Sequence, residues 1–197
     1  MRVIGVSGFI GAGKSTLLNY IKEKYNATVI EADEVSKEVI NDKKVIKFLK
    51  SDIPHALVEG QIDRSILRTE VFNNKELNDK FTSIIWPLIS KRINKLIKKT
   101  KNVRVIVVEA AIIGGLNVKF DRTVLLTKNF EQRIDGVQKR DARDIEEIKS
   151  ISEYQNERLK GYPFNYVLEN NGDFEEFYEK IDNLVLKLQS DFRDQKK

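Results

Sequence analysis

The chain opens on a short apolar run that leads directly into a glycine-rich stretch. The run from Val3 to Val6 predicts a buried strand, and glycines punctuate residues 8–13. Apolar side chains then recur at positions 17, 18, 21 and 25, which is the spacing of one helix face. The beginning of the chain therefore predicts a strand, a tight loop and a helix, in that order.

Apolar runs and helical periods alternate along the rest of the chain. Short apolar runs predict further strands at 27–30, 103–108, 123–126 and 166–168. Apolar positions at helical spacing predict helices at about 35–49, 64–72, 75–99, 130–159 and 174–188, followed by a polar tail at 190–197. Pro87 lies inside the period at 75–99 and is expected to kink or divide that helix. Strands that alternate with helices predict an α/β fold on a parallel sheet.

Composition and charge narrow the classes of protein and ligand. A length of 197 residues predicts one compact domain, and the absence of cysteine excludes disulfides, thiolate metal sites and cysteine nucleophiles. The net charge of +5 favours polyanionic ligands such as nucleotides or coenzymes. The charges alternate in sign, unlike the concentrated basic face of a nucleic-acid binder. No stretch approaches the roughly 20 apolar residues of a membrane span. We therefore expect a soluble, cytoplasmic protein that acts on a small molecule, without a nucleic-acid or membrane partner.

Residues 8–15 match the phosphate-loop pattern G-x-x-x-x-G-K-[ST]. Its glycines let successive backbone N–H groups point at phosphate oxygens, and the following helix directs its positive N-terminal end at the same anion. Lys14 supplies a cation for the β- and γ-phosphates, and the Ser15 hydroxyl is a ligand for Mg²⁺. The flanking strand and helix argue against a chance match in a glycine-rich turn. We expect ATP here, held by Gly8, Gly11, Ala12, Gly13, Lys14, Ser15 and Thr16.

Two carboxylates follow or end predicted strands, where a parallel sheet places its ligand-facing loops. Asp33 follows the strand at 27–30 and could accept a proton from an acceptor hydroxyl or hold Mg²⁺ through water. A helix N-cap is the alternative role for Asp33. Glu109 ends the strand at 103–108, a position typical of the acidic partner of a phosphate loop, with a solvated strand end as its alternative.

A basic segment and one aromatic residue complete the candidates. Lys139, Arg140 and Arg143 lie in the charged helical stretch at 130–159, where Arg140 could neutralise charge on a transferring phosphoryl group. A solvated helix face is the alternative for this basic triplet. Trp86 falls on an apolar helical face, for which core packing is the default role.

Several segments, taken in order, carry a resemblance to a known family. They are residues 4–16, 29–33 (Val-Ile-Glu-Ala-Asp), 60–64 (Gly-Gln-Ile-Asp-Arg) continued to 72, and 167–172 (Val-Leu-Glu-Asn-Asn-Gly). Gln132-Arg133, Arg140 and Gln155 fall where the same family has its lid residues and a glutamine. Over residues 2–188 the chain resembles the dephospho-coenzyme A kinases. The phosphate loop is shared by many families, so the blocks at 62–64 and 170–172 discriminate best.

The resemblance implies a phosphate-loop NTPase fold of the nucleoside-monophosphate-kinase type, with a five-stranded parallel sheet, a helical acceptor region and a lid. Within a single domain of residues 1–197, the core would comprise about 1–34, 101–130 and 160–190, the acceptor region about 35–100 and the lid about 131–159. The implied enzyme is a kinase of coenzyme A biosynthesis. With ATP and Mg²⁺, it phosphorylates the ribose 3′-hydroxyl of dephospho-coenzyme A.

The resemblance also implies roles for single residues. Lys14, Asp33 and Arg140 would be catalytic, with Asp33 as the base or orienting group for the hydroxyl and Arg140 acting from the lid. Asn171 would join the nucleotide-binding residues. The acceptor-binding residues would be Asp33, Arg64, Trp86 and Glu109.

The chain departs from the family pattern on the acceptor side. Trp86-Pro87 stands where the family has His-Pro, Gly115 stands where it has a glutamate, and Phe164-Asn165 replaces an Ala-Asp pair. Two alternatives therefore stay open: another small-molecule kinase with a nucleoside or nucleotide acceptor, and a relative that binds ATP without turnover. A nucleotide-dependent switch protein is disfavoured, because the chain has no Asn-Lys-x-Asp loop. The sequence predicts no oligomeric state.

Overall fold

The computed structural model describes residues 1–141 and 144–194, which form two compact units. The first unit comprises Met1–Glu31, Lys101–Gly114 and the described residues from Lys119 onward. The second comprises Ala32–Thr100 and Gly115–Val118. The predicted division into core, acceptor region and lid within one domain stays a prediction.

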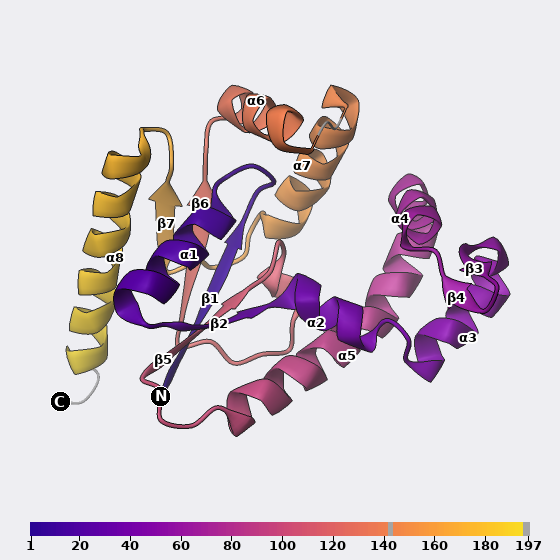
Figure 1. Ribbon diagram of the computed structural model, residues 1–197, viewed down its shortest axis with the longest axis horizontal. Coiled ribbons are helices and arrows are strands. Elements are labelled where there is room, and N and C mark those ends of the chain that lie inside the picture. The colour runs from indigo at the N-terminus through magenta and orange to yellow at the C-terminus, as the bar shows by residue number, and fades with distance from the viewer. Residues whose placement is uncertain (142–143, 195–197) are drawn as a thin grey trace. The chain divides into compact units, whose positions relative to one another are not determined.

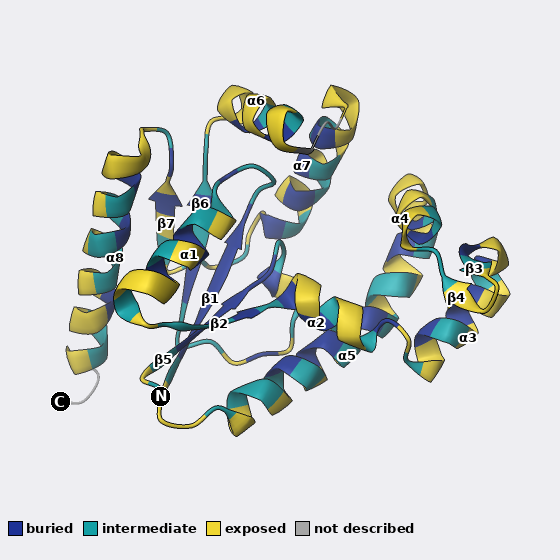
Figure 2. Ribbon diagram, in the orientation of Figure 1, coloured by how far each residue is buried: buried dark blue, intermediate teal, exposed yellow. Residues whose placement is uncertain are grey.

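The first unit is built on the five-stranded parallel sheet that the sequence predicts (Figure 1). Its spatial order is β2-β5-β1-β6-β7, with every neighbouring pair parallel. The central strands are mostly buried, which explains why they read as continuous apolar runs (Figure 2). The bounds are β1 (Arg2–Gly8), β2 (Thr28–Glu31), β5 (Val105–Glu109), β6 (Arg122–Thr127) and β7 (Tyr166–Glu169).

Helices α1 (Lys14–Tyr25) and α8 (Phe174–Asp194) pack against this sheet. Their buried side chains, Leu17, Leu18, Ile21, Phe177, Ile181 and Leu188, form one core cluster with the strands. Helix α8 runs past the predicted end at residue 188. Positions 190–194 of the expected polar tail are therefore helical, and positions 195–197 lie outside the described residues.

The expected helical stretch at 130–159 is two helices, α6 (Phe130–Asp141) and α7 (Ile145–Leu159). The prediction of one continuous element is therefore wrong. Asp144 caps α7, because its side chain accepts a hydrogen bond from the Glu146 N–H at 3.0 Å. Arg143, a member of the predicted basic triplet, lies outside the described residues.

The second unit is mainly helical. Residues 35–49, predicted as one helix, divide into α2 (Ala32–Val39) and α3 (Lys43–Asp52). Asp42 ends the continuity, because its carboxylate accepts from the Lys44 N–H and so begins a new helix. After η1 (Pro54–Ala56), strands β3 (Leu57–Val58) and β4 (Gln61–Ile62) form a small antiparallel hairpin. Helices α4 (Arg64–Asn73) and α5 (Lys75–Lys99) follow.

Pro87 does not divide α5, which continues for 25 residues with the proline inside it. Ile85, Ile89 and Ile93 are buried at intervals of four residues on both sides of Pro87. Helices α2, α3 and α4 pack against α5. Tertiary packing of this apolar stripe therefore outweighs the loss of one backbone hydrogen bond at the proline.

Among the residues described, no helix combines the length and apolar character needed to cross a membrane.

Candidate functional site

The phosphate loop joins β1 to α1 in the first unit, and η2 (Ile113–Gly115) follows the neighbouring β5. Gly11 and Gly13 have φ angles of 76° and 99°, a left-handed conformation that L side chains rarely adopt. A Cβ atom on Gly13 would also lie 2.4 Å from the side-chain nitrogen of Asn170. Glycine at position 13 is therefore required by the backbone angle and by the close approach of Asn170.

Lys14 is held inside the loop by carbonyl oxygens. Its Nζ donates to the Gly8 oxygen at 2.9 Å and to the Phe9 oxygen at 3.3 Å. The same Nζ lies 4.0 Å from Oε1 of Glu109, at the carboxyl end of β5. Glu109 is only 5% exposed, so the alternative of a solvated strand end is wrong. Ser15 and Thr16 follow Lys14 in the sequence and lie in the first turn of α1.

Three side chains from other elements hold the middle of the phosphate loop. The Ile10 N–H donates to Oε1 of Gln155 on α7 at 2.8 Å, and the Ile10 oxygen accepts from Nη1 of Arg133 on α6 at 3.3 Å. The Ala12 oxygen accepts from Nδ2 of Asn170 at 2.9 Å. Since Gln155, Arg133 and Asn170 are all buried, these contacts fix the loop within the fold.

Arg133 forms the largest part of this support. Its guanidinium also donates to the Lys128 oxygen and to Ser152 Oγ, both at 3.1 Å. The rings of Phe9 and Phe130 lie 4.8 and 5.1 Å from its central carbon. Burial lowers the pKa of the Arg133 guanidinium from its ordinary value, yet an arginine stays charged in proteins. Helices α6 and α7 are thus bonded to the phosphate loop at one end.

The sequence named Arg133, Gln155 and the Asn170 block only through the resemblance, without a role. A role follows from the fold alone, because these residues lie more than 100 positions from the loop in the chain. Asn171, expected on the nucleotide side, joins the loops after β6 and β7. Its Oδ1 accepts from the Asn129 N–H at 2.8 Å, and its backbone oxygen accepts from Gln132 Nε2 at 3.2 Å.

Gln155→Ala is expected to raise the KM for ATP by about 2- to 10-fold, the equivalent of one lost hydrogen bond. The Ile10 N–H then loses its acceptor, and the loop samples conformations that do not fit phosphate. Initial-rate kinetics against ATP measure the change. Asn156→Ala, at the next and exposed position of α7, is the matched control and should leave the KM unchanged. An unchanged KM in Gln155→Ala would contradict a positioning role.

Asp33 and Arg64 lie on two helices of the second unit. Asp33 is exposed in the first turn of α2, two residues after β2 ends. The helix already begins at Ala32, so Asp33 lies within the helix and is not its N-cap. Arg64 begins α4, and its Nη2 donates to the Lys37 oxygen of α2 at 3.3 Å. Arg64 therefore links α4 to the helix that carries Asp33.

Trp86 lies against the backbone of Gly115, so two departures from the family pattern meet at one place. A Cβ atom at position 115 would lie 2.3–2.5 Å from three atoms of the Trp86 six-membered ring. Only glycine leaves room for the indole there. Trp86 is half-buried, and a cavity of about 370 Å³ beside it is also lined by Ser90, Lys91 and Asn117. The large side chain at position 86 therefore occupies the space that the absence of a side chain at position 115 leaves.

Gly115→Ala is expected to destabilise the protein by about 1–3 kcal/mol, the usual cost of overpacking. The melting temperature measures it. Gly136→Ala is the control, because a Cβ at this helical position meets nothing within 4 Å. The double variant Gly115→Ala/Trp86→His should lose less stability than the sum of the single variants, since imidazole lacks the clashing ring. Strict additivity would show that the two positions are independent.

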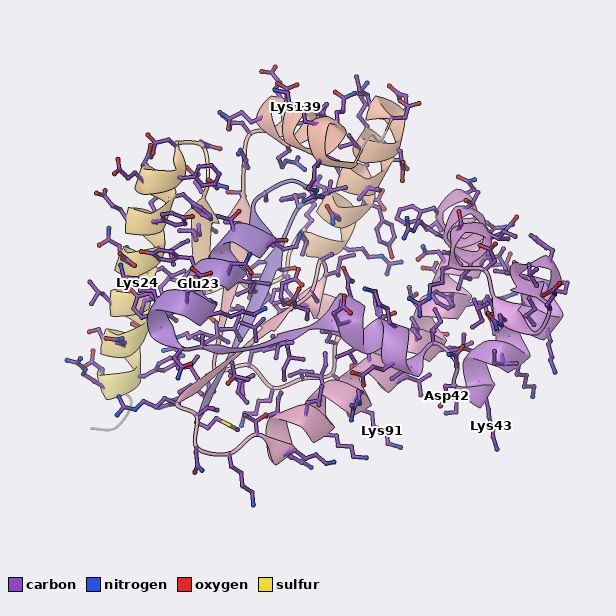
Figure 3. All side chains as sticks on the ribbon, in the orientation of Figure 1. Glu23, Lys24, Asp42, Lys43, Lys91 and Lys139 are labelled. Atoms are coloured by element: carbon purple, nitrogen blue, oxygen red, sulfur yellow. The ribbon has the colours of Figure 1, made fainter. Side chains whose placement is uncertain are left out.

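Arg140 lies in the last turn of α6, beside Lys139, which Figure 3 labels. Both side chains are exposed, whereas Arg133 on the same helix is buried against the phosphate loop. Helix α6 therefore has one arginine bonded to the loop and another near its opposite end.

Comparisons with known proteins show the family to which the chain is similar. The dephospho-CoA kinase family matches residues 2–176. The chain is 30% identical to the dephospho-CoA kinase of Fusobacterium nucleatum, over 91% of this chain and 95% of the relative. It is 26% identical to the dephospho-CoA kinase of Saccharomyces cerevisiae, over 96% of this chain and 83% of the relative.

Solved structures show the same fold. The crystal structure of a Thermus thermophilus protein aligns with a TM-score of 0.79 and 24% identity. The alignment covers 94% of this chain and 96% of the Thermus thermophilus chain. The dephospho-CoA kinase of Campylobacter jejuni gives a TM-score of 0.58 at 22% identity, with coverage of 94% and 96%. With the phosphate loop, its parallel sheet and a family match over most of its length, this chain belongs to the dephospho-CoA kinase family.

Proposed function

We propose that the chain transfers the γ-phosphoryl group of ATP to the ribose 3′-hydroxyl of dephospho-coenzyme A, giving coenzyme A. The observation that carries the proposal is the phosphate loop, with Lys14 held by loop carbonyls beside the buried Glu109. The family match supports the choice of acceptor. We place the reaction in the cytoplasm, as expected for a step of coenzyme A biosynthesis.

The first unit supplies the nucleotide side. The N–H groups of the loop and the first turn of α1 stabilise the phosphates, and the Lys14 ammonium leaves its carbonyl partners to neutralise the β- and γ-phosphates. We assign Glu109 to orienting Lys14, its 4.0 Å neighbour. A direct contact of Glu109 with the acceptor stays a prediction. We assign Asn171 to the adenine side of the nucleotide site, on the resemblance alone; its Oδ1 accepts from the Asn129 N–H between the loops after β6 and β7.

The donors near the loop fit Mg²⁺. Ser15 is exposed at the start of α1 and offers a hard oxygen. Within the described part of the chain, no group of three His, Cys, Asp or Glu side chains forms a metal cage. Mg²⁺ suits such a site, because it usually keeps several waters and binds through substrate phosphates. Ser15 would hold the ion, which supplies charge neutralisation between the β- and γ-phosphates when bound.

The second unit supplies the acceptor side. We assign Asp33 to orienting or deprotonating the 3′-hydroxyl, and Arg64 to the acceptor phosphates, for which a guanidinium is well suited. The indole of Trp86 offers an aromatic surface for the adenine or ribose of dephospho-coenzyme A. Its half-burial leaves part of that surface accessible. Gly115 permits this placement of the ring.

Arg140→Ala is expected to reduce kcat more than it raises the KM for ATP, because a charge contact made mainly in the transition state acts on kcat. Steady-state kinetics over an ATP series measure both constants. Lys139→Ala removes the same charge from the preceding exposed position and should change little. Equal effects of the two variants would favour a solvated helix face, and a pure KM effect would indicate ground-state binding.

A turnover assay with ATP and a panel of acceptors tests the proposed function. We expect a high kcat/KM with dephospho-coenzyme A and much lower values with adenosine, deoxyadenosine and AMP. Preferred turnover of a nucleoside or nucleotide would favour the alternative small-molecule kinase. ATP binding without turnover of any acceptor would favour the inactive relative.

A further inference from the structure

A second cavity, of about 430 Å³, lies within the first unit and is lined by α1, α8 and the sheet. Its volume is within the range of roughly 300–1,000 Å³ that is typical of small-molecule sites. Protein interiors otherwise pack as densely as organic crystals, with few voids larger than a water molecule. A cavity of this size in the first unit is therefore large enough to bind a small-molecule ligand.

The cavity is separate from the phosphate loop. The residues after α1 and before β5, including Ala27 and Arg104, line it, and so does Phe192 near the end of α8. These segments precede the strands, so this part of the lining lies at the amino-terminal edge of the sheet, where Figure 1 marks the N-terminus. The phosphate loop follows β1 at the opposite, carboxyl edge. The cavity thus has no part in the proposed nucleotide contacts.

The walls and the rim of the cavity differ in chemistry. Its walls are aliphatic side chains of the core, among them Ile21, Val124 and Ile181. Its polar lining comes from Tyr25, Asn26, Asn102, Arg104 and Gln189. Among the described lining residues there is no carboxylate. An apolar interior with neutral donors and one cation suits a ligand with a hydrocarbon chain and an anionic head.

The charges around Phe192 strengthen this choice. The Phe192 ring lines the cavity, and the guanidinium carbons of Arg2 and Arg122 lie 4.7 and 5.7 Å from its centre. Asp121 and Asp191 already pair with these two arginines, at 3.1 and 3.0 Å. The lining residue Tyr25 donates to Asp182, whose charge Lys24 balances at 2.7 Å. Arg104 is exposed and adds a cation beyond these three pairs, so the charges named here leave a net excess of one positive charge. A cationic head would be repelled there, whereas a carboxylate would be attracted.

We propose that this cavity binds a medium-chain monocarboxylate, with the hydrocarbon chain among the aliphatic walls and the carboxylate beside Arg104. The binding is non-covalent, and it is independent of the proposed transfer reaction. The shape of the cavity selects the hydrocarbon chain of the ligand, and the positive charge nearby selects its carboxylate.

Calorimetric titration of the whole chain with laurate, below its micelle concentration, tests the proposal. One laurate is expected to bind per chain and to raise the melting temperature. Dodecanol should bind more weakly, and dodecyltrimethylammonium should not bind. Arg104→Gln should weaken laurate binding by roughly 10-fold or more, the equivalent of a charged hydrogen bond. Lys101→Gln, an exposed position outside the lining, is the matched control. Absence of laurate binding, or equal binding of all three amphiphiles, would overturn the proposal.

Filling the cavity separates this site from adsorption to the surface. Val185→Phe places a ring in the lining and should abolish laurate binding, whereas Leu186→Phe changes the adjacent, exposed residue and should not. Ala27→Leu fills the cavity from a residue that follows α1. This second variant tests the proposal if Val185→Phe fails to fold. Turnover should be unchanged in every folded variant. Undiminished laurate binding by a folded filling variant would place the ligand elsewhere and reject this cavity.

Discussion

Lys14→Ala is expected to abolish phosphoryl transfer, with kcat/KM reduced by at least roughly 10³-fold. The Lys14 ammonium is held by two loop carbonyls and lies 4.0 Å from Glu109. Lys14 is the side chain that the phosphate-loop pattern assigns to the β- and γ-phosphates. Because phosphoryl transfer depends on positioning and charge neutralisation, no other part of the loop can replace this charge. A coupled assay of ADP formation measures the loss.

Folding must be separated from chemistry in this variant, because the buried Glu109 loses its neighbouring cation. Lys14→Met keeps the aliphatic stem and serves as a second variant. Lys22→Ala, on the same helix but paired with Glu31 at the surface, is the matched control and should keep normal turnover. Circular dichroism and the melting temperature show whether each variant is folded. Near-normal turnover by a folded Lys14 variant would contradict the proposed role of the loop.

The sheet and the phosphate loop could be predicted from the sequence because each rests on local rules. Buried parallel strands read as apolar runs, and glycine-rich turns between a strand and a helix have few other uses. The strand order adds what a sequence pattern does not contain. It brings β5 beside β1, which places Glu109 near Lys14 although the two are far apart in the chain.

Two helix boundaries were missed for a local reason. Asp42 and Asp144 each accept a backbone N–H and begin a new helix, yet the apolar spacing continues across both positions. The structure, and not the apolar spacing, identified both aspartates as helix N-caps. Pro87 shows the opposite case. A local rule predicted a kink or a division, and the helix is undivided, with Ile85 and Ile89 packed on either side of the proline. A kink there stays a prediction.

The residues that support the site were beyond prediction from the sequence alone. Gln155 and Asn170 act through single hydrogen bonds to the loop, and nothing in their sequence neighbourhood marks such bonds. The exchange between Trp86 and Gly115 is similar. Each position appeared as an isolated departure, and only their contact shows that the two compensate one another.

Asp33→Asn is expected to lower kcat by roughly 10²–10⁴-fold, the usual contribution of a positioned general base. Asparagine keeps the size and shape of the side chain but cannot accept the hydroxyl proton. Asp33 is exposed in the first turn of α2, so the change should leave the fold intact. The KM for ATP should change little, because the nucleotide contacts are assigned to the first unit. Steady-state kinetics with dephospho-coenzyme A as the varied substrate measure the effect.

Glu34→Gln is the matched control for Asp33. Glu34 is the next residue of the same helix turn, is also exposed, and forms a surface ion pair with Lys37 at 2.5 Å. Its neutralisation tests whether a negative charge anywhere in this turn is sufficient. We expect near-normal kcat for Glu34→Gln, and equal losses in both variants would contradict a specific role of Asp33. Weakened ATP binding with unchanged kcat in Asp33→Asn would instead indicate a metal-binding role. A titration with Mg²⁺ distinguishes the two roles, because a lost metal contact is restored by excess Mg²⁺ and a lost base is not.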